Sequence, residues 1–507
     1  MKKSLGLLLA LLIGLNGLFG MPVLAETAVK DSVTIGLNVS LASLEPMSAF
    51  SREEQYVIAN TFDTLIELED GVYVGELAKS FEISEDMLTY TFVLNENVYF
   101  HNGEHLTASD VKYTFDNLAS FSFWEGNAHY IASVETEGDY TVVIHATNPT
   151  AYNMVVLSGT EIINEKAITE LGEAHRFAPV GTGPYRVVSY DGFNTIKLER
   201  NDDYFKWTDG NYPPIQYVTY KVFSDPQAMS LALEAGELDL VSKVDAAYAL
   251  PFEEKSGYTV YWLDADGVYL LLFNCGLAPF DNKLVRQAVA YGVDRESINL
   301  IVSEGKDLPW DYFYSPAQAG APDYDTLPHF TYDLEKAKAL LAEAGYPNGI
   351  KLEQAVPIMN TQERYAVAIQ QQLAQIGIDF DIEILEQNTL YDKIFAMDYQ
   401  LLTFSLSTEI YEMSYVAKYF YTPAKKARLF PTGEFGTPEL DELIAKGEAT
   451  SDMATRVDLY TQIYTTLFDE QPLTAIMSKQ TSIIKKDNLT YSTPNILKVK
   501  IERLAWE

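Results

Sequence analysis

The 507-residue chain is poor in cysteine and in basic residues, and each shortage excludes a class of structure or function. With Cys275 as its only cysteine, the chain forms no intramolecular disulfide, so its stability must come from core burial. Only 36 lysines and arginines stand against 72 aspartates and glutamates, which gives a formal charge of -36. A surface of this sign repels the phosphate backbone of nucleic acids, so no nucleic-acid partner is expected.

The sequence also lacks the compact motifs of common hydrolases. No Gly-x-Ser-x-Gly elbow, His-Glu-x-x-His zinc helix or Cys-x-x-Cys pair occurs. His101 and His105 are four residues apart, but Asn102-Gly103 between them breaks any helix that would align both for a metal ion. A secreted hydrolase with paired carboxylates is the alternative from another class, because acidic residues are abundant. We expect a protein that is not an enzyme, with no catalytic residue, metal or cofactor.

Long apolar runs are scarce too, and the longest opens the chain. Two lysines precede a run from Leu5 to Leu24, which glycines and Pro22 interrupt. Val23-Leu24-Ala25 then places small residues at the spacing that signal peptidase requires, so residues 1–25 are predicted to be a cleaved signal peptide. A retained membrane anchor is the alternative, which the interruptions disfavour.

The length of the chain predicts more than one folding unit. A chain of 507 residues exceeds what a single compact core holds, so at least two units are expected. Hydrophobic residues make up 47% and charged residues 21%, a balance that excludes a largely disordered protein.

Strands dominate the first half of the predicted structure. Strands are expected at 33–39, 88–94, 98–101 and 238–241, with more between 185 and 223. One helix is expected over 54–65. Thr107 is expected to open a second helix, and Asp225-Pro226 a third that ends at Gly236.

Helices alternate with strands in the second half, which is typical of α/β layers. Residues 268–274 form a nearly continuous apolar run, as in a strand buried on both faces. Helices are predicted at 283–291, from an Asp333 N-cap to Gly345, and through 366–376. Residues 378–384 alternate strictly between apolar and acidic side chains, which predicts one strand with a buried and a wet face.

Four separated segments carry a family resemblance. The first combines 75–80, Phe100-His101-Asn102-Gly103 and 106–111; the second combines Val180-Gly181-Thr182-Gly183-Pro184-Tyr185 and 199–204. The third joins Phe273-Asn274, Pro279-Phe280-Asp281, Val285-Arg286-Gln287-Ala288 and Asp294-Arg295. The fourth joins Tyr332-Asp333, Ala337-Lys338 and 340–346. In this order, the segments resemble the family 5 extracellular solute-binding proteins, the dipeptide, oligopeptide and nickel binders of ABC importers.

The resemblance implies an α/β, two-lobed periplasmic-binding-protein-like fold of type II. An extra subdomain is inserted in lobe I, and hinge strands join the lobes. It further implies that a di- or oligopeptide is captured between the lobes and delivered to the permease subunits of an ABC transporter in the membrane. A monomer is the default for this family.

The resemblance also implies a division of the chain. Lobe I is expected to comprise 26–46, 181–270 and 490–507, and the inserted subdomain 47–180. Lobe II is expected to span 276–484, with hinge segments at 271–275 and 485–489.

The sequence departs from the family in two places. Many relatives are lipoproteins with a cysteine just after the signal segment. None occurs here, so the protein is expected to be free in a periplasm or secreted. Peptide-binding members usually carry a Trp and an Asp-Pro pair in the lobe II loop after a strand like 399–404, and the loop at 405–412 has neither. Nickel chelates or another small cationic solute are therefore the alternative ligands, although six dispersed histidines rank nickel below peptides.

Candidate ligand contacts centre on that loop. Glu409 and Glu412 are the candidates for the carboxylate that meets a peptide's ammonium, with a solvated acidic loop as the alternative. The further candidates are Ser405, Ser407, Tyr411, Trp124, Tyr152, Asn153, Gly181, Thr182 and Gly183.

Two groups of residues in the family segments admit both a binding and a structural role. The glycines and Pro184 predict a rigid 181–185 loop that exposes backbone amides, with an ordinary structural turn as the alternative. Arg286 and Arg295 fit bracing between packed elements better than contact with a ligand carboxylate.

Overall fold

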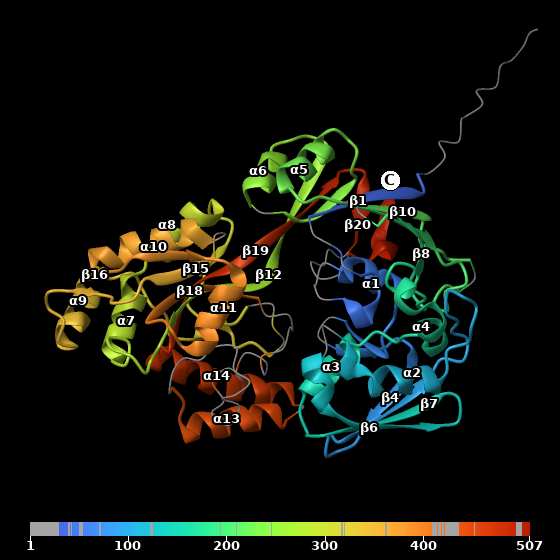
Figure 1. Cartoon of the computed structure of the whole chain (residues 1–507), viewed down its shortest axis with the longest axis horizontal. Helices are drawn as coiled ribbons and strands as arrows, with labels where there is room; N and C mark the ends of the chain where they lie inside the picture. The colour runs from blue at the N-terminus through green and yellow to red at the C-terminus, as the bar shows by residue number, and fades with distance from the viewer. Residues whose placement is uncertain are drawn as a thin grey trace, which may run out of the picture.

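The computed structural model describes residues 30–492 with gaps, and residues 499–507. The gaps are 39–40, 42, 50–53, 70–71, 122–124, 193, 209, 245, 316–317, 319, 360–361, 408–412, 414–416, 418–419, 421–434 and 451. The chain folds into two α/β lobes that lie side by side, joined by two long strands, as the sequence predicts (Figure 1).

Within the described residues, one nine-stranded sheet runs through both lobes. Its order is β18-β12-β19-β11-β1-β10-β9-β8, and β13 pairs with β19 off this path. The strands are β1 (Ser32–Leu37), β8 (Tyr185–Tyr190), β9 (Thr195–Arg200), β10 (Tyr217–Val222), β11 (Leu240–Val244), β12 (Tyr258–Phe273), β13 (Leu308–Pro309), β18 (Leu401–Ser407) and β19 (Leu473–Lys486). Strand β1 is parallel to β10 and β11, whereas the other pairs are antiparallel.

The two long strands stay paired with each other through both lobes, but their outer neighbours differ from one lobe to the other. Residues 258–264 of β12 pair with 480–486 of β19, whose other side pairs with β11 in lobe I. Residues 268–272 of β12 still pair with β19, and 267–273 pair on their other side with β18 in lobe II; the register of the β12–β19 pair shifts between Asp264 and Val268. The crossing between lobes therefore lies at 264–268 of β12 and 478–480 of β19.

This crossing lies away from the hinge segments expected at 271–275 and 485–489. Leu271 and Phe273 are fully buried in the lobe II core, and Lys485 pairs with Leu240 in lobe I. The apolar run at 268–274 is a strand buried within lobe II, as the sequence predicts, whereas the hinge expected at 271–275 came from the family resemblance. A crossing between lobes has less to bury, so its sequence shows no such run.

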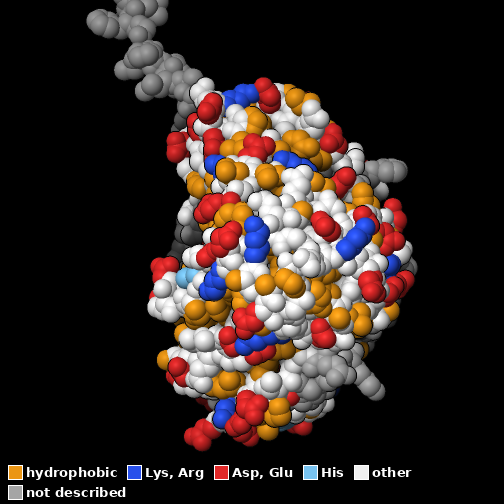
Figure 2. Space-filling model, turned by 90° about the vertical axis from the view of Figure 1, so that its left-hand side faces the viewer, with side chains coloured by type: hydrophobic (Ala, Val, Ile, Leu, Met, Phe, Trp, Pro, Cys, Tyr) orange, Lys and Arg blue, Asp and Glu red, His pale blue; other side chains and the backbone are white. Residues whose placement is uncertain are grey.

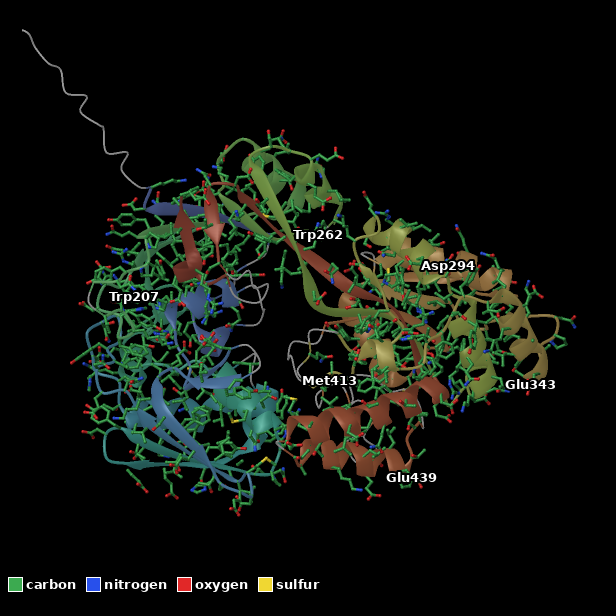
Figure 3. The ribbon with its side chains drawn as sticks, turned by 180° about the vertical axis from the view of Figure 1, so that it is seen from behind. Trp207, Trp262, Asp294, Glu343, Met413 and Glu439 are labelled. Carbon is green, nitrogen blue, oxygen red and sulfur yellow. The ribbon has the colours of Figure 1, made fainter. Side chains whose placement is uncertain are left out.

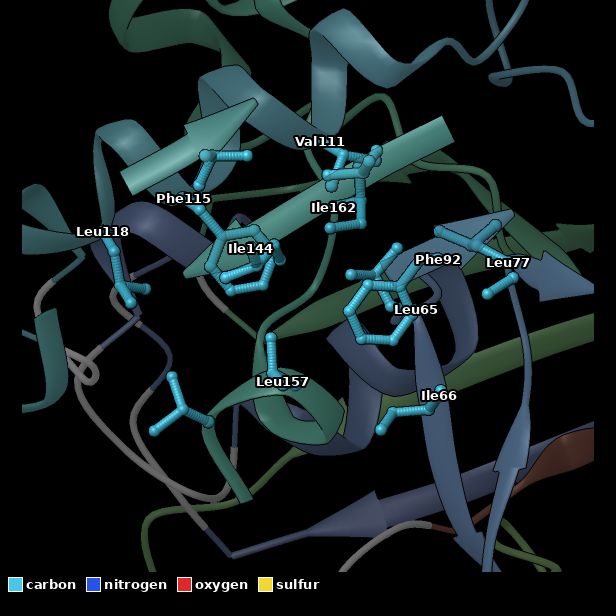
Figure 4. Packing of buried hydrophobic residues seen from close by; sticks show 14 of the residues in the cluster. Leu65, Ile66, Leu77, Phe92, Val111, Phe115, Leu118, Ile144, Leu157 and Ile162 are labelled. Atoms are coloured by element: carbon cyan, nitrogen blue, oxygen red, sulfur yellow. The ribbon is translucent and has the colours of Figure 1, made fainter. Parts of the chain in front are cut away.

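The inserted subdomain of lobe I has a core of its own (Figure 4). Its sheet has the order β4-β5-β7-β6, and α2 packs against β6 and β7. Its elements are β2 (Ile66–Glu69), β3 (Val72–Gly75), β4 (Ala78–Ile83), β5 (Thr89–Leu94), β6 (Ile131–Glu137), β7 (Thr141–Ala146), α2 (Ala108–Asp116), α3 (Tyr152–Gly159) and α4 (Glu165–Leu171). Thr107 caps α2 in a capping box with Asp110, which confirms the predicted helix start.

The predicted strand at 98–101 does not form. Its residues belong to a turn whose only ladder contact in the described chain is an isolated bridge between Tyr99 and His105. Gly103 has a φ of +84° and closes this turn at once, which leaves too few residues for a second strand.

Lobe II surrounds its part of the sheet with helices. They are α7 (Lys283–Gly292), α8 (Arg295–Ser303), α9 (Leu334–Glu343), α10 (Glu363–Gln375), α11 (Gln387–Ala396), α13 (Pro438–Glu448) and α14 (Met453–Glu470). The sequence predicts three of them, α7, α9 and α10. Asp333 caps α9 by accepting from the Lys336 amide at 2.9 Å, as expected. Lobe I adds α1 (Gln55–Thr61), α5 (Pro226–Glu234), α6 (Ala246–Glu253), β20 (Leu489–Tyr491) and β21 (Leu504–Trp506).

The alternating segment 378–384 forms two short strands rather than one. Strand β16 (Ile378–Asp379) pairs in parallel with β14 (Ile350–Lys351), and β17 (Ile382–Leu385) with β15 (Val356–Met359). The segment that pairs with it, 350–359, is itself interrupted at 352–355. There the Gln400 side chain accepts from the amides of Glu353 and Gln354. Because paired strands are joined residue by residue, an interruption in one strand also interrupts the other.

The two arginines of the family segments brace the lobe. Arg286 is buried and donates to the carbonyls of Phe280, Glu470 and Gln471 at 2.7–3.1 Å. Arg295 is also buried and donates to the Ala475 carbonyl at 3.1 Å. Arg286 thus joins α7 to residues 470–471 just before β19, and Arg295 joins α8 to β19 itself, as the bracing interpretation predicts.

Acidic side chains are spread over the face of lobe II that Figure 2 shows, and those that the structure places there do not form one cluster. Lysines and arginines are set singly among them. Among the described residues, none of the helices combines the length and the apolar character needed to cross a bilayer. Cys275 lies just after β12 and is only partly buried, and burial raises the pKa of its thiol to about 11.

Candidate functional site

The edge strand β18 ends where the two lobes meet. Ser407, its last residue, pairs with Gly267 of β12, inside the crossing segment. Since β18 is the outermost strand of the sheet, one of its backbone edges faces away from β12. An edge strand is a template onto which an extended peptide adds through main-chain hydrogen bonds.

Gln362 covers part of this edge with its side-chain amide. With the amide oriented so that both of its polar atoms find partners, the nitrogen donates to the Thr403 carbonyl at 3.2 Å and the oxygen accepts from the Ser405 N–H at 3.1 Å. Backbone groups of alternate residues face the same edge, so the N–H and C=O of Ser407 lie next in line beyond Gln362. Sequence reasoning missed Gln362, since a single glutamine before a helix has no pattern that marks it.

Buried polar side chains gather on one face of β18. Ser405 lies opposite Tyr269 in the ladder, and the Tyr269 ring contacts Tyr365 with centroids 4.9 Å apart. The hydroxyls of Thr403, Ser405 and Tyr365 are buried, and no hydrogen-bond partner is found for them among the described residues. Such groups are usually satisfied by ordered water or by a ligand. Ser405, a predicted contact, thus lies in a polar setting at the lobe junction.

Several predicted contacts lie outside the described residues. They are Trp124, Glu409, Tyr411 and Glu412, together with the side chain of Ser407. The roles proposed for them stay predictions.

Tyr152 and Asn153 lie inside the inserted subdomain, which corrects the expectation that they face a ligand. Tyr152 is 1% exposed and its hydroxyl donates to Asn127 at 3.1 Å. Asn153 is fully buried and its amide donates to the Tyr90 hydroxyl and the Asn148 carbonyl. Both sit at the start of α3, whose apolar neighbours draw that turn of the helix into the core.

The Gly181-Thr182-Gly183 loop packs against the end of α1 as a structural turn. The Gly183 amide donates to the Thr61 carbonyl at 3.0 Å, and the Thr182 hydroxyl donates to Asp63 at 2.7 Å. A Cβ added to Gly181 would lie 1.9 Å from the Thr61 oxygen. The glycines therefore serve close backbone approach, which corrects the prediction that they expose amides to a ligand.

Behind this loop lies a cluster of buried charges that the sequence did not reveal. Asp63 accepts from Thr182 and from the Tyr204 hydroxyl at 2.9 Å. Glu76 accepts from the Lys206 ammonium at 3.2 Å. Burial, followed by the charge of Glu76, raises the pKa of Asp63 to about 7. The family segments contain three of these five residues, Glu76, Thr182 and Tyr204, but their sequence spacing does not show that they meet.

This raised pKa predicts a specific pH dependence of stability. The folded state binds the Asp63 proton more tightly than the unfolded state, whose aspartate has a pKa near 3.8. The contribution of protonated Asp63 is therefore full below about pH 4 and is lost as the pH rises toward 7. We expect the Asp63→Asn variant to gain stability relative to the wild type over this interval, as measured by urea unfolding at each pH. Asp116→Asn on the exposed side of α2 is the control, and a wild-type-to-variant difference that stays constant with pH would contradict the assignment.

The lobes also touch on both sides of the site. Near the crossing, the Lys306 ammonium of lobe II lies 2.6 Å from Glu253 of lobe I. At the far side, the Ala151 amide at the start of α3 donates to the Glu448 carbonyl at the end of α13, 3.1 Å away. Figures 1 and 3 both show α3 and α13 side by side, opposite the long strands. The lobes are thus in contact at two places, near the crossing and between the ends of α3 and α13.

Removing the Ala151 donor tests the second contact. Ala151 has a φ of -59°, which proline adopts without strain, so Ala151→Pro deletes one N–H and keeps the backbone. A single hydrogen bond contributes about 0.5–1.5 kcal/mol, so the lobes should separate more often. We expect a longer mean distance between spin labels on Lys166 and Glu439 in a Cys275→Ser background. Ala151→Gly keeps the donor and is the control; equal distances in both variants would argue against a contact that holds the lobes.

Comparison with known proteins places this geometry in a family. The profile of the bacterial extracellular solute-binding proteins, family 5 middle region, matches residues 72–428. The chain is 26% identical over 499 residues to the glutathione-binding protein GsiB of Pectobacterium atrosepticum, covering 93% of each chain. It is 29% identical over 453 residues to the oligopeptide-binding protein AppA of Bacillus subtilis, covering 82% of this chain and 79% of the relative.

Solved structures show the same fold. The DppA protein of Helicobacter pylori in complex with the peptide STSA superposes with a TM-score of 0.77 at 24% identity, covering 94% of this chain and 98% of that chain. HbpA2 of Haemophilus parasuis reaches a TM-score of 0.84 at 21% identity, covering 94% and 100%. The match over most of its length, the two-lobed fold and the crossing strands make this chain a member of the family 5 bacterial extracellular solute-binding proteins.

Proposed function

We propose that the protein captures a peptide between its lobes and delivers it, unaltered, to an ABC importer. The observation that carries this proposal is the position of β18, an edge strand whose last residue pairs at the crossing between the lobes. Main-chain pairing to such an edge binds peptides of different sequence, and water can fill the side-chain pockets.

The relatives support a peptide ligand. GsiB is named for glutathione and AppA for oligopeptides, and the DppA structure is a complex with the peptide STSA. These ligands share amide bonds, a free ammonium and a carboxylate. A small cationic solute or nickel chelate is the alternative, since the 405–412 loop lacks the Trp and the Asp-Pro pair of peptide binders.

The proposed hinge is the crossing itself. At 264–268 of β12 and 478–480 of β19, a register shift interrupts the ladder between the two long strands. Rotation at these few residues closes one lobe on the other as a rigid body. Closure removes water, so the charged ends of the ligand meet fixed partners in a medium of low dielectric constant.

We propose that the protein acts outside the cytoplasm. The first 25 residues have the pattern of a cleaved signal peptide, and no cysteine follows the predicted cleavage site for lipid attachment. The mature protein is thus proposed to diffuse in the periplasm or to be secreted, and to meet the importer's permease subunits at the membrane.

The solute that co-purifies with the protein tests the proposal. Purified protein is denatured, the released small molecules are identified by mass spectrometry, and each is returned to ligand-free protein in a thermal-shift assay. We expect a short peptide that raises the melting temperature and is recovered chemically unchanged after incubation. A sugar, a metal complex or a hydrolysed peptide would refute the proposed ligand or the proposed absence of turnover.

A further inference from the structure

A pocket of about 500 Å³ opens on lobe I, where the inserted subdomain meets the main sheet. The loop after β5 and the segment after β9 supply most of its wall, and β8 adds Arg186. Trp207, on that wall, lies on the flank of lobe I turned away from lobe II (Figure 3). The pocket is therefore separate from the site between the lobes.

The pocket offers a flat aromatic surface. Trp207 contacts Tyr185, Tyr204 and Tyr212 at interplanar angles of 79°, 69° and 87°, so these three rings meet it edge to face. No ring stacks in parallel on the indole among the described residues, and Trp207 is only partly buried. Tyr99, 50% exposed, stands at the rim. Aromatic rings of this kind give an apolar face and, in tryptophan, one N–H donor.

The polar groups of the pocket nearly balance in charge. Arg186 pairs with Glu199 at 3.6 Å, and Arg200, behind the wall, pairs with Asp202 at 2.6 Å. His101 donates from Nε2 to the Gly183 carbonyl at 2.9 Å, and burial lowers its pKa to about 4, so its ring is neutral near pH 7. Asp203 is exposed and has no ion pair within the described residues. The wall thus combines donors and acceptors without a strong field of either sign.

We propose that this pocket binds a neutral sugar ring of the pyranose type. A pyranose has an apolar C–H face, which fits against an indole, and a rim of hydroxyls that both donate and accept. Asp203 accepts from such hydroxyls, while Arg186 and Asn97 donate to them. The volume lies within the range of about 300–1,000 Å³ found for small-molecule sites, which also favour junctions between structural units. Arginines already pair with Glu199 and Asp202, so Asp203 is the one carboxylate of the wall, within the described residues, left to attract a cation.

Saturation-transfer NMR with the full-length mature protein tests the proposal. The probes are N-acetylglucosamine, glucose, galactose and mannose, with arginine and spermidine as cationic comparators. We expect at least one sugar to bind at millimolar concentration or below. Trp207→Ala should weaken that binding by about tenfold or more, and Asp203→Asn by several-fold. Tyr332→Ala, at an aromatic residue 43% exposed on lobe II, is the matched control and should bind as the wild type does.

Each other outcome overturns the proposal. It fails if none of the sugars binds, if both pocket variants bind as the wild type does, or if only the cations bind. Trp207 packs against buried Tyr204, so the variants are first compared by thermal unfolding; exposed Asp203→Asn keeps the test valid if Trp207→Ala is unstable. Binding of the inter-lobe solute should be unchanged in all three variants, so failure here leaves the proposed transport function untouched.

Discussion

Peptide affinity is expected to fall by about 30-fold or more when the carboxylate that receives the ligand's ammonium becomes an amide. Truncating one partner of a desolvated charge pair costs about 2–5 kcal/mol, because the other charge stays buried without its partner. The candidates are Glu409 and Glu412, which follow the end of β18 and lie outside the described residues. Calorimetry on Glu409→Gln and Glu412→Gln with the co-purified peptide measures the loss directly.

The position of β18 gives this prediction its physical basis. Its last residue pairs with Gly267 at the crossing, so the chain leaves the strand at the junction of the lobes. We therefore propose that a carboxylate within a few residues of that point in the sequence meets the end of a peptide paired to the strand edge. Glu335→Gln on α9, where the side chain is 91% exposed, is the matched control and should bind normally. Wild-type affinity in both loop variants would remove both residues from the site.

The methyl group that a Gly181→Ala substitution adds is expected to destabilise lobe I strongly. An alanine Cβ at this position would lie 1.9 Å from the Thr61 carbonyl oxygen and 2.8 Å from the Thr61 carbonyl carbon. The neighbouring atoms are backbone, so they move only if α1 and the loop separate. Overpacking of this kind costs about 1–3 kcal/mol and more where backbone must shift, so we expect at least about 3 kcal/mol for Gly181→Ala.

Urea unfolding of Gly181→Ala measures this cost. Gly276→Ala is the matched control, because its added Cβ would meet only the Asn274 side-chain oxygen at 3.4 Å, an ordinary contact. The control should stay within about 1 kcal/mol of the wild type. If Gly181→Ala matched the control, the close approach between the loop and α1 would not be a feature of the folded protein.

Much of the fold can be predicted from the sequence because local signals mark it. Helix starts are fixed by side chains next to them, as Thr107 and Asp333 illustrate. The two-lobed class follows from the family segments, whose resemblance the fold confirms. The prediction for segment 378–384 fails because its alternation matches burial only over 378–381, whereas Ile384 is 50% exposed, and because it does not show where the partner strand breaks.

The site is harder to predict, because residues far apart in sequence create it. Gln362 reaches β18 from the start of α10, and Asp63 meets Thr182 across more than a hundred residues. Composition also misleads: the glycines near Thr182 suggest an exposed loop, but they are needed where two backbones touch. Tyr152 illustrates the same limit, since tyrosine suits a wet surface and a core equally well.

The central claim is that two lobes close on an unreacted solute by rotation at the crossing of β12 and β19. Small-angle scattering of the ligand-free protein, with and without the saturating co-purified peptide, tests it most directly. A smaller radius of gyration with the peptide, and return to the first curve when the intact peptide is dialysed away, is the result we predict. Identical curves at saturation would contradict it.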